Sequence, residues 1–268
     1  MNLPEPEEVL SGGNINKVVK VGGTVRRAVA SPDPYVHELL MHLEQAGYPS
    51  SPRYIGIDEE GREILSFLEG VVPGNDYPDI EPYMWSDDTL AELAKLLRNY
   101  HNATVGFMAS VRSANEYPER SLHEVVCHND AALYNIVFKD NHPIGLIDFD
   151  MSGPGPRIWD IAYTLYTSIP LASFAPNNKD RAVVQYEREE HAALRRRRID
   201  LFFKSYGLAV PIDLKQWVIS RMKLMCTTLS ERAESGDMAF VRLVEEGHLG
   251  HYLSEVSFLE QHFDDWWN

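Results

Sequence analysis

The first seventy residues of the chain alternate between apolar and polar positions, as half-buried β-strands do. Residues 16–21 and 24–30 both alternate, and the glycine pair between them predicts a tight hairpin turn. A second hairpin is predicted within residues 53–70. Residues 31–47 instead carry apolar positions at helical spacing and end in glycine, which predicts one helix. The pattern therefore indicates a mainly β segment with a single helix.

After residue 70 the pattern changes to one that is typical of helices. A loop rich in Pro, Asp and Tyr leads to a helix predicted over residues 87–102, and three long helical patterns with few strand signals follow residue 181. Between them, two short apolar runs at 136–138 and 144–147 enclose turn residues, which predicts one more hairpin. The second part of the chain is therefore expected to be larger and mostly helical.

Composition and charge narrow the classes of partner. The 268 residues carry a net charge of −15 at pH 7, which argues against nucleic acid or an anionic membrane surface and suits a cationic small ligand. The four arginines at 195–198 are accordingly interpreted as a solvated helix face, and the tryptophan pair at 266–267 as packing.

Two further observations predict a cytoplasmic protein. The N-terminal residues lack the basic and apolar regions of a signal peptide, and the longest uncharged run, 161–178, contains prolines that make it a poor membrane span. The two cysteines, Cys127 and Cys226, lie far apart in the sequence, so neither a disulfide framework nor a zinc cage is expected.

The predicted hairpin between residues 136 and 147 carries hydrogen-bonding side chains at both ends. If its strands pair antiparallel, Asn135 before the first strand meets Asp148 after the second. The amide and carboxylate oxygens of these residues are the hard donors that suit Mg²⁺. Asp130, on the loop that enters the hairpin, could accept a proton or a hydrogen bond from a substrate hydroxyl.

The spacing of these residues resembles the catalytic loop and metal-binding segment of kinases. The motif His128-x-Asp130-x-x-x-x-Asn135 is followed by the sequence IDFD at 147–150. Asn129 stands where protein kinases have Arg, and a second Asp replaces the glycine of their DFG sequence. Both differences resemble the aminoglycoside phosphotransferase and choline kinase superfamily.

The resemblance implies a fold and an activity. The fold would be an α+β, two-lobe, protein-kinase-like structure, with a small β-rich N-terminal lobe at 1–70 and a larger, mostly helical C-terminal lobe at 71–268. The function would be transfer of the γ-phosphate of ATP to a hydroxyl of a small molecule, such as an aminoglycoside or another amine-bearing alcohol. ATP and Mg²⁺ would be the cofactors.

The resemblance also implies a role for each residue of the motif. Asp130 would orient and deprotonate the acceptor hydroxyl, while Asn135 and Asp148 would hold Mg²⁺. His128 would support the loop, Asp150 would support the metal site or act in it, and Asp160 in the sequence PRIWDIAYTL would brace the loop.

The nucleotide site implied by the resemblance lies in the first seventy residues. Gly12 and Gly13, in the sequence LSGGNINKVVKV, would cover the phosphates, and backbone groups near Ser66 and Leu68 would bind adenine. The strand lysine of the family is absent.

In place of that lysine, the sequence TVRRAV offers Arg26 or Arg27, which strand alternation sends to opposite faces, and Arg26 is favoured. Glu38 is the candidate for the helix glutamate that normally pairs with this base, although the family register falls nearer Val36.

Two other functions remain open from the sequence. The first is a metal-dependent hydrolase in which Asp130, Asp148 and Asp150 surround an activated water. The second is a pseudokinase that binds nucleotide without turnover. The segment 69–92, with seven acids and no Lys or Arg, is interpreted either as a solvated connector or as a wall that attracts a cationic substrate.

Overall fold

A computed structural model describes residues 6–10, 18–29, 34–177 and 180–267. The chain divides into two compact units, the first formed by residues 1–77 and 95–157 and the second by residues 78–94 and 158–268. This division follows compactness rather than chain order. The lobe boundary at residue 70 stays a prediction.

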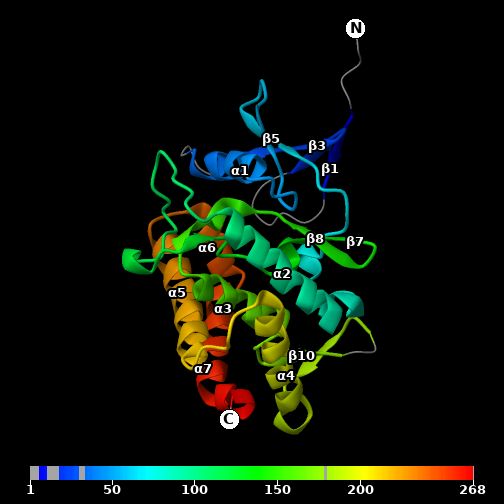
Figure 1. Cartoon of the computed structure of the whole chain (residues 1–268), viewed down its shortest axis with the longest axis vertical. Coiled ribbons are helices and arrows are strands. Elements are labelled where there is room, and N and C mark those ends of the chain that lie inside the picture. Colours follow the sequence, from blue (N-terminus) through cyan, green and yellow to red (C-terminus); the bar gives the residue numbers. More distant parts are fainter. Residues whose placement is uncertain (1–5, 11–17, 30–33, 178–179, 268) are drawn as a thin grey trace. The chain divides into compact units, whose positions relative to one another are not determined.

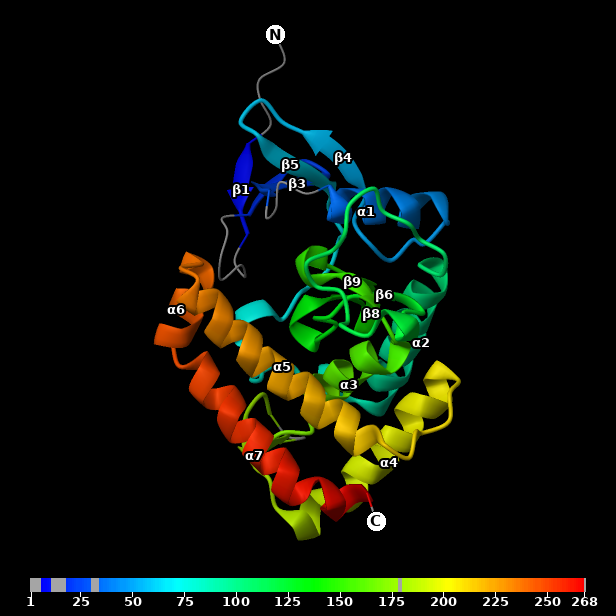
Figure 2. The same cartoon turned by 90° about the vertical axis from the view of Figure 1, so that its left-hand side faces the viewer.

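The first unit contains a five-stranded antiparallel sheet and one helix (Figure 1). The strand order is β1-β2-β3-β5-β4. The strands are β1 (Glu7–Val9), β2 (Val19–Val21), β3 (Thr24–Ala28), β4 (Tyr54–Ile57) and β5 (Arg62–Ser66). Helix α1 (Tyr35–Gln45) buries an apolar stripe that includes Leu39, Leu40 and Leu43, and it lies beside the sheet in both Figures 1 and 2. Both predicted hairpins and the predicted helix are confirmed.

The rest of the first unit consists of the second half of helix α2 (Asp87–Ala103), short strands and turns. The strands are β6 (Val125–Cys127), β7 (Ile136–Lys139), β8 (His142–Leu146) and β9 (Gly153–Gly155); β6 pairs with β9 and β7 with β8. In the described part of the chain, short 3₁₀ helices interrupt the loops: η1 (Gly74–Asp76), η2 (Pro82–Trp85), η3 (Arg120–Leu122), η4 (Leu133–Asn135) and η5 (Phe149–Met151). The β7–β8 pair confirms the hairpin predicted between residues 136 and 147.

The second unit is mainly helical. Its helices are α3 (Arg157–Ser168), α4 (Arg188–Tyr206), α5 (Leu214–Glu234), α6 (Met238–Glu245) and α7 (His248–Trp267), and α2 (Asp87–Ala103) contributes its first half. Helices α5 and α7 pack side by side (Figure 2). A two-stranded sheet of β10 (Phe174–Pro176) and β11 (Val183–Gln185) was not predicted, because strands of three residues are too short for a periodic signal. Trp266 is 1% exposed, so its expected role in packing is confirmed.

The run of four arginines on α4 was expected to be a solvated face, and for two of its members this was wrong. Arg195 and Arg198 are buried at 2% and 6% exposure. They lie three residues apart and therefore share one side of the helix. Arg195 donates from Nη2 to the main-chain oxygens of Ala172 at 2.8 Å and Phe174 at 2.7 Å. Its guanidinium also covers the ring of Tyr186, 4.2 Å from the centroid.

Arg198 joins three parts of the second unit. Its Nη1 donates to the main-chain oxygen of Trp85 at 2.7 Å and to Asp87 Oδ1 at 2.9 Å, and its Nη2 donates to the main-chain oxygen of Ser168 at 3.2 Å. The start of α2, the end of α3 and the middle of α4 therefore share one buried cation.

Among the described helices, none combines the length and the apolar composition that a membrane span would need.

Replacing Arg198 with alanine is expected to destabilise the protein by about 3 kcal/mol, because removing one partner leaves buried polar groups unsatisfied. Arg197 is the matched control. It contacts the same Asp87 at 2.6 Å, but its side chain is 55% exposed, so Arg197→Ala should cost less than about 1 kcal/mol. Urea denaturation of the two variants measures both losses. Equal losses would show that Arg198 does not join the three helices as described.

Candidate active site

The β7–β8 hairpin brings Asn135 and Asp148 together. Ile136 pairs with Leu146, and the main-chain N–H of Ile147 donates to the main-chain oxygen of Asn135 at 3.0 Å. Asp148 follows in a left-handed conformation with φ 66° and ψ 68°, which is uncommon for a residue other than glycine. The two strand ends therefore meet, as the sequence pattern predicts.

The side chain of Asn135 has a defined orientation. Its Nδ2 donates to Asp130 twice, to Oδ2 at 2.8 Å and to the main-chain oxygen at 3.0 Å. Both partners can only accept, so the amide oxygen must point the other way. No hydrogen bond to this Oδ1 occurs among the described residues, which leaves a hard oxygen for a cation.

Asp148 offers a second oxygen of the same kind. Its side chain is 47% exposed, and among the described residues only its Oδ1 is bonded, to Arg27 at 3.2 Å. One amide and one carboxylate oxygen fit Mg²⁺, which is usually held by one or two carboxylates together with substrate phosphates. No group of three or more His, Cys, Asp or Glu in the described part of the chain is arranged to hold a metal. The donor set therefore fits a metal shared with a phosphate ligand.

Two donors fix the carboxylate of Asp130. Besides Asn135, the hydroxyl of Tyr134 donates to Asp130 Oδ1 at 2.5 Å. The ring of Tyr134 packs edge to face against Tyr77, with centroids 5.6 Å apart. Sequence analysis did not single out Tyr134. Its place immediately before Asn135, on the turn of η4, was the available signal.

His128 connects the start of the loop to the segment that follows β8. Its Nε2 lies 3.0 Å from the main-chain oxygen of Ile147, and its ring packs on Phe149 with centroids 4.7 Å apart. The side chain is completely buried. These contacts are those that a residue supporting the loop would make.

Arg27 lies among three carboxylates. Its Nη1 donates to Asp148 Oδ1 at 3.2 Å and to Asp150 Oδ2 at 3.0 Å, its Nη2 to Asp150 Oδ1 at 2.5 Å, and its Nε to Glu63 Oε1 at 2.6 Å. Burial raises the pKa of Asp150 to about 6, and nearby Asp148 adds to this, while the charge of Arg27 opposes it. Strand β3 is therefore linked to the segment after β8 through a single guanidinium.

The choice of Arg26 over Arg27 is corrected by this geometry. The two side chains do point to opposite faces of β3, as alternation requires. Arg26, however, contacts Thr24 and approaches Asp58 at 3.8 Å, away from the acids of the IDFD segment. Arg27 is the arginine that faces the candidate metal site.

Glu38, the candidate for the helix glutamate, does not contact Arg27 in the described hydrogen bonds and ion pairs. Glu38 on α1 accepts from the main-chain N–H of Ser110 at 2.7 Å and from its hydroxyl. The acid beside Arg27 is Glu63 of β5, which lies directly opposite in the β3–β5 register. The sequence signal for Glu63 was an acid on the same face of the strand as the buried Leu65.

The residues expected at the nucleotide are placed only in part. Gly12 and Gly13 lie outside the described residues. The main-chain N–H of Ser66 donates to Arg53 at 2.9 Å and is committed to the sheet. The described hydrogen bonds include none from the main chain of Leu68, and its contact with adenine stays a prediction. Asp160 is completely buried on α3, and its bracing role stays a prediction.

The acidic segment at 69–92 is partly neutralised. Glu69 contacts Lys139 at 2.9 Å, Glu81 contacts Arg181 at 3.7 Å, and Asp87 contacts the two arginines described above. These basic partners reduce the net negative field that the sequence of this segment suggests.

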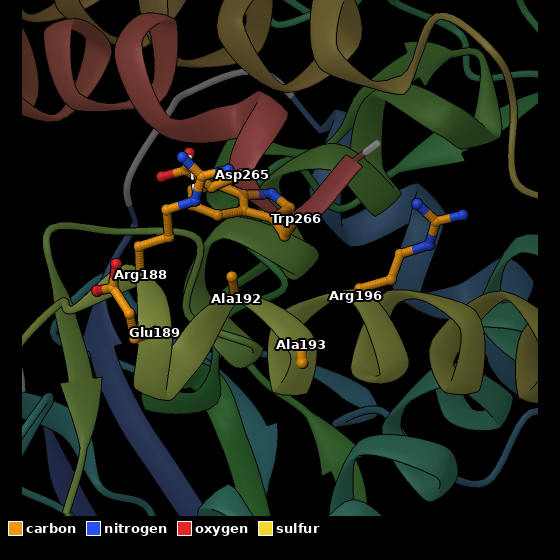
Figure 3. A pocket seen from close by; sticks show the side chains of 7 residues that line it. All are labelled: Arg188, Glu189, Ala192, Ala193, Arg196, Asp265 and Trp266. Atoms are coloured by element: carbon orange, nitrogen blue, oxygen red, sulfur yellow. Dashed lines mark ion pairs between the residues drawn. The ribbon is translucent and has the colours of Figure 1, made fainter.

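A separate hollow of about 390 Å³ lies on the second unit. Figure 3 shows its lining from α4 and α7, where Arg188 and Asp265 form an ion pair at 3.4 Å. The candidate active-site residues belong to the first unit, so this hollow is a different feature. Its lining residues are Arg188, Glu189, Ala192, Ala193, Arg196, Asp265 and Trp266.

Three solved structures share the fold across most of the chain. Amicoumacin kinase, in complex with AMP-PNP, Ca²⁺ and Ami, aligns with TM-score 0.61 at 14% identity over 91% of this chain and 89% of its own. The gentamicin complex of APH(2")-IIa gives 0.58 at 13% identity over 98% and 94%. A choline/ethanolamine kinase family protein from Mesorhizobium loti gives 0.54 at 15% identity over 94% and 92%. The expected α+β, protein-kinase-like fold is confirmed.

Sequence comparisons point to the same group. The trifolitoxin immunity protein of Rhizobium leguminosarum bv. trifolii is 35% identical over 154 residues, which is about half the length of each chain, at 55% of this one and 56% of the relative. The model of the phosphotransferase enzyme family matches residues 76–199, a range that contains the whole motif from His128 to Asp150. Through these residues the chain is similar to the phosphotransferase enzyme family, in agreement with the resemblance of its motif.

Proposed function

We propose that the protein transfers the γ-phosphate of ATP to a hydroxyl group of a small molecule. The observation that carries this proposal is that Asp130, Asn135 and Asp148 meet at one hairpin. The side-chain oxygens of Asn135 and Asp148 would bind a metal, whereas the carboxylate of Asp130 would accept the proton of the hydroxyl. The match of residues 76–199 to the model of a phosphotransferase family supports the reaction class. The nucleotide complexes of proteins with this fold support ATP as the donor.

Asp130 is the proposed base. Tyr134 and Asn135 hold its carboxylate in one orientation, so the acceptor hydroxyl meets a fixed hydrogen-bond acceptor. In phosphoryl transfer the transition state is loose, and most of the catalysis comes from positioning and charge neutralisation. Holding Asp130 rigidly is therefore a larger contribution than making it a strong base.

Asn135 Oδ1 and Asp148 are the proposed metal ligands. Mg²⁺, when bound, would neutralise charge on the phosphates. Arg27 would take the place of the family's strand lysine. A guanidinium binds phosphate through two parallel N–H groups, so its orientation matters more than that of an ammonium group.

The acceptor is proposed to carry an amine. The segment 69–92, with seven acids and no Lys or Arg, would attract a cation. Proteins with this fold are found in complex with gentamicin, streptomycin and kanamycin, which supports a small-molecule acceptor.

The two alternatives receive less support. A hydrolase would need Asp150 beside Asp130 and Asp148 around a metal, yet Asp150 is held by both Nη groups of Arg27. A pseudokinase would need a defect at the nucleotide. In this proposal Arg27 takes the role of the missing lysine, so the changed base alone supplies no such defect.

Immunity to a toxin is a second candidate function, because the relative with 35% identity carries that name. The two functions are compatible, since phosphorylation of a toxic small molecule would protect the cell that carries the enzyme. Protection that survives loss of the Asp130 carboxylate would instead indicate immunity by binding alone.

Asp130→Asn is expected to lower the rate of transfer by about 10²-fold or more, because the shape is kept and the proton acceptor is lost. Binding of ATP·Mg²⁺ should remain. The measurement is incubation with ATP and Mg²⁺ against a panel of hydroxylated small molecules, scored by mass spectrometry for added phosphate. An acceptor that the variant phosphorylates at the normal rate would refute the assignment.

Arg27→Ala is expected to weaken ATP binding by about tenfold or more, since charge-assisted hydrogen bonds to phosphate are lost. Arg26→Ala, the neighbour on the other face of β3, should change it by less than about twofold. Titration calorimetry with ATP and Mg²⁺ measures both. The opposite ranking would restore the choice of Arg26.

Neutralising Asp76, Asp79 and Glu81 together is expected to raise the KM of an amine-bearing acceptor while the KM of ATP stays unchanged. Added salt should lower kcat/KM for that acceptor, because exposed charges are screened beyond about 8 Å at physiological ionic strength. Steady-state kinetics at two salt concentrations test both effects. A neutral acceptor turned over equally well, without either effect, would make the segment a solvated connector.

A further inference from the structure

We infer that Glu63 on β5 and His37 on α1 together position Arg27, replacing the helix glutamate that pairs with the strand base in kinases. This inference rests on the proposed function, because it assigns how the phosphate-binding arginine is held. It places the negative partner on the neighbouring strand and leaves the helix with a hydrogen-bonding imidazole.

Glu63 is placed to act as a fixed partner. It lies opposite Arg27 in the antiparallel register, and Arg27 Nε donates to its Oε1 at 2.6 Å. Its exposure is 2%. Burying a charged carboxylate is costly unless it has a charged partner and further hydrogen bonds. Separating Glu63 from Arg27 would therefore leave a buried charge unpaired, which stabilises the pair.

His37 supplies the second hydrogen bond to the same carboxylate. Its Nε2 lies 2.9 Å from Glu63 Oε2. The imidazole also stacks on Tyr54 of β4, with centroids 4.0 Å apart and ring planes 15° apart. His37 therefore contacts two strands of the sheet from the first turn of α1, and both oxygens of Glu63 are satisfied.

The glutamate on the helix serves elsewhere. Glu38 is adjacent to His37 but binds Ser110, on the loop that follows α2. The side chains of neighbouring helical residues point in different directions, so one cannot replace the other by a change of rotamer. The contact between α1 and the arginine consequently runs through His37 and Glu63.

The geometry also explains the effect of holding Arg27 through Glu63 and His37. With Nε fixed by Glu63, the two Nη groups of Arg27 point to Asp148 and Asp150, beside the proposed metal ligands. A guanidinium that is fixed at one end loses less freedom when its other N–H groups bind phosphate. Glu63 and His37 are thus positioning residues that act through Arg27.

Four variants test the inference by titration calorimetry with ATP and Mg²⁺ and by steady-state kinetics. Glu63→Gln removes the charge and keeps the shape. His37→Phe keeps a ring that can stack on Tyr54 but loses the hydrogen-bonding nitrogen, whereas His37→Gln restores a donor at the position of Nε2. Glu38→Gln on the same helix is the matched control.

The expected result is an affinity for ATP·Mg²⁺ about tenfold lower in Glu63→Gln and about threefold to tenfold lower in His37→Phe. His37→Gln should recover most of the loss, and Glu38→Gln should bind as the unmodified protein does. KM for ATP should rise while kcat at saturating ATP changes little, a separation that a general loss of stability would not produce.

Two outcomes overturn the inference in different ways. Normal binding by Glu63→Gln, or a loss in Glu38→Gln in place of Glu63→Gln, would return the pairing to the helix glutamate and leave the proposed function intact. Failure of the unmodified protein to bind ATP·Mg²⁺ would refute the proposed function itself, and the positioning role with it.

Discussion

The structure of the candidate site depends on one cation held among three carboxylates. Arg27 is bonded to Glu63 on β5 and to Asp148 and Asp150 in the segment after β8. A buried charge is costly unless it is paired. Because the guanidinium of Arg27 needs all of these acids as partners, it holds the sheet and the segment after β8 together. The cluster retains an excess of negative charge, which favours a divalent cation beside it. The same cluster of charges therefore stabilises the fold and favours binding of a divalent cation.

The segment after β8 is held from a second side as well. Asn129 Nδ2 donates to the main-chain oxygens of Asn115 at 3.2 Å and Met151 at 2.9 Å, and Ser113 donates to the main-chain oxygen of Ser152 at 2.7 Å. A Cβ on Gly153 would lie 2.4 Å from the main-chain oxygen of Asn115. Only glycine permits this approach, which keeps the backbone around the metal ligands in place.

Sequence patterns predicted the hairpin and the meeting of Asn135 with Asp148, because both follow from local alternation and turn residues. They could not choose between two adjacent arginines, since alternation gives opposite faces without saying which face meets the acids. Glu63 escaped notice because its partner lies 36 residues away in the chain. The buried arginines of α4 were missed for a related reason. Net charge indicates only that most charged side chains are solvated, whereas the burial of these two depends on main-chain oxygens that distant segments of the chain supply.

The position of Glu63 has a consequence for how the proposed phosphotransferase activity would be controlled. Where the partner acid sits on a helix, displacing that helix breaks the pair and switches a kinase off. Here the pair joins two strands that are already hydrogen-bonded to each other, and α1 contributes one imidazole contact. A shift of α1 would weaken the arrangement without dismantling it. Such an arrangement would suit a phosphotransferase of the proposed kind that is constitutively active. Its rate would then depend on the amount of protein and of substrate rather than on a conformational signal.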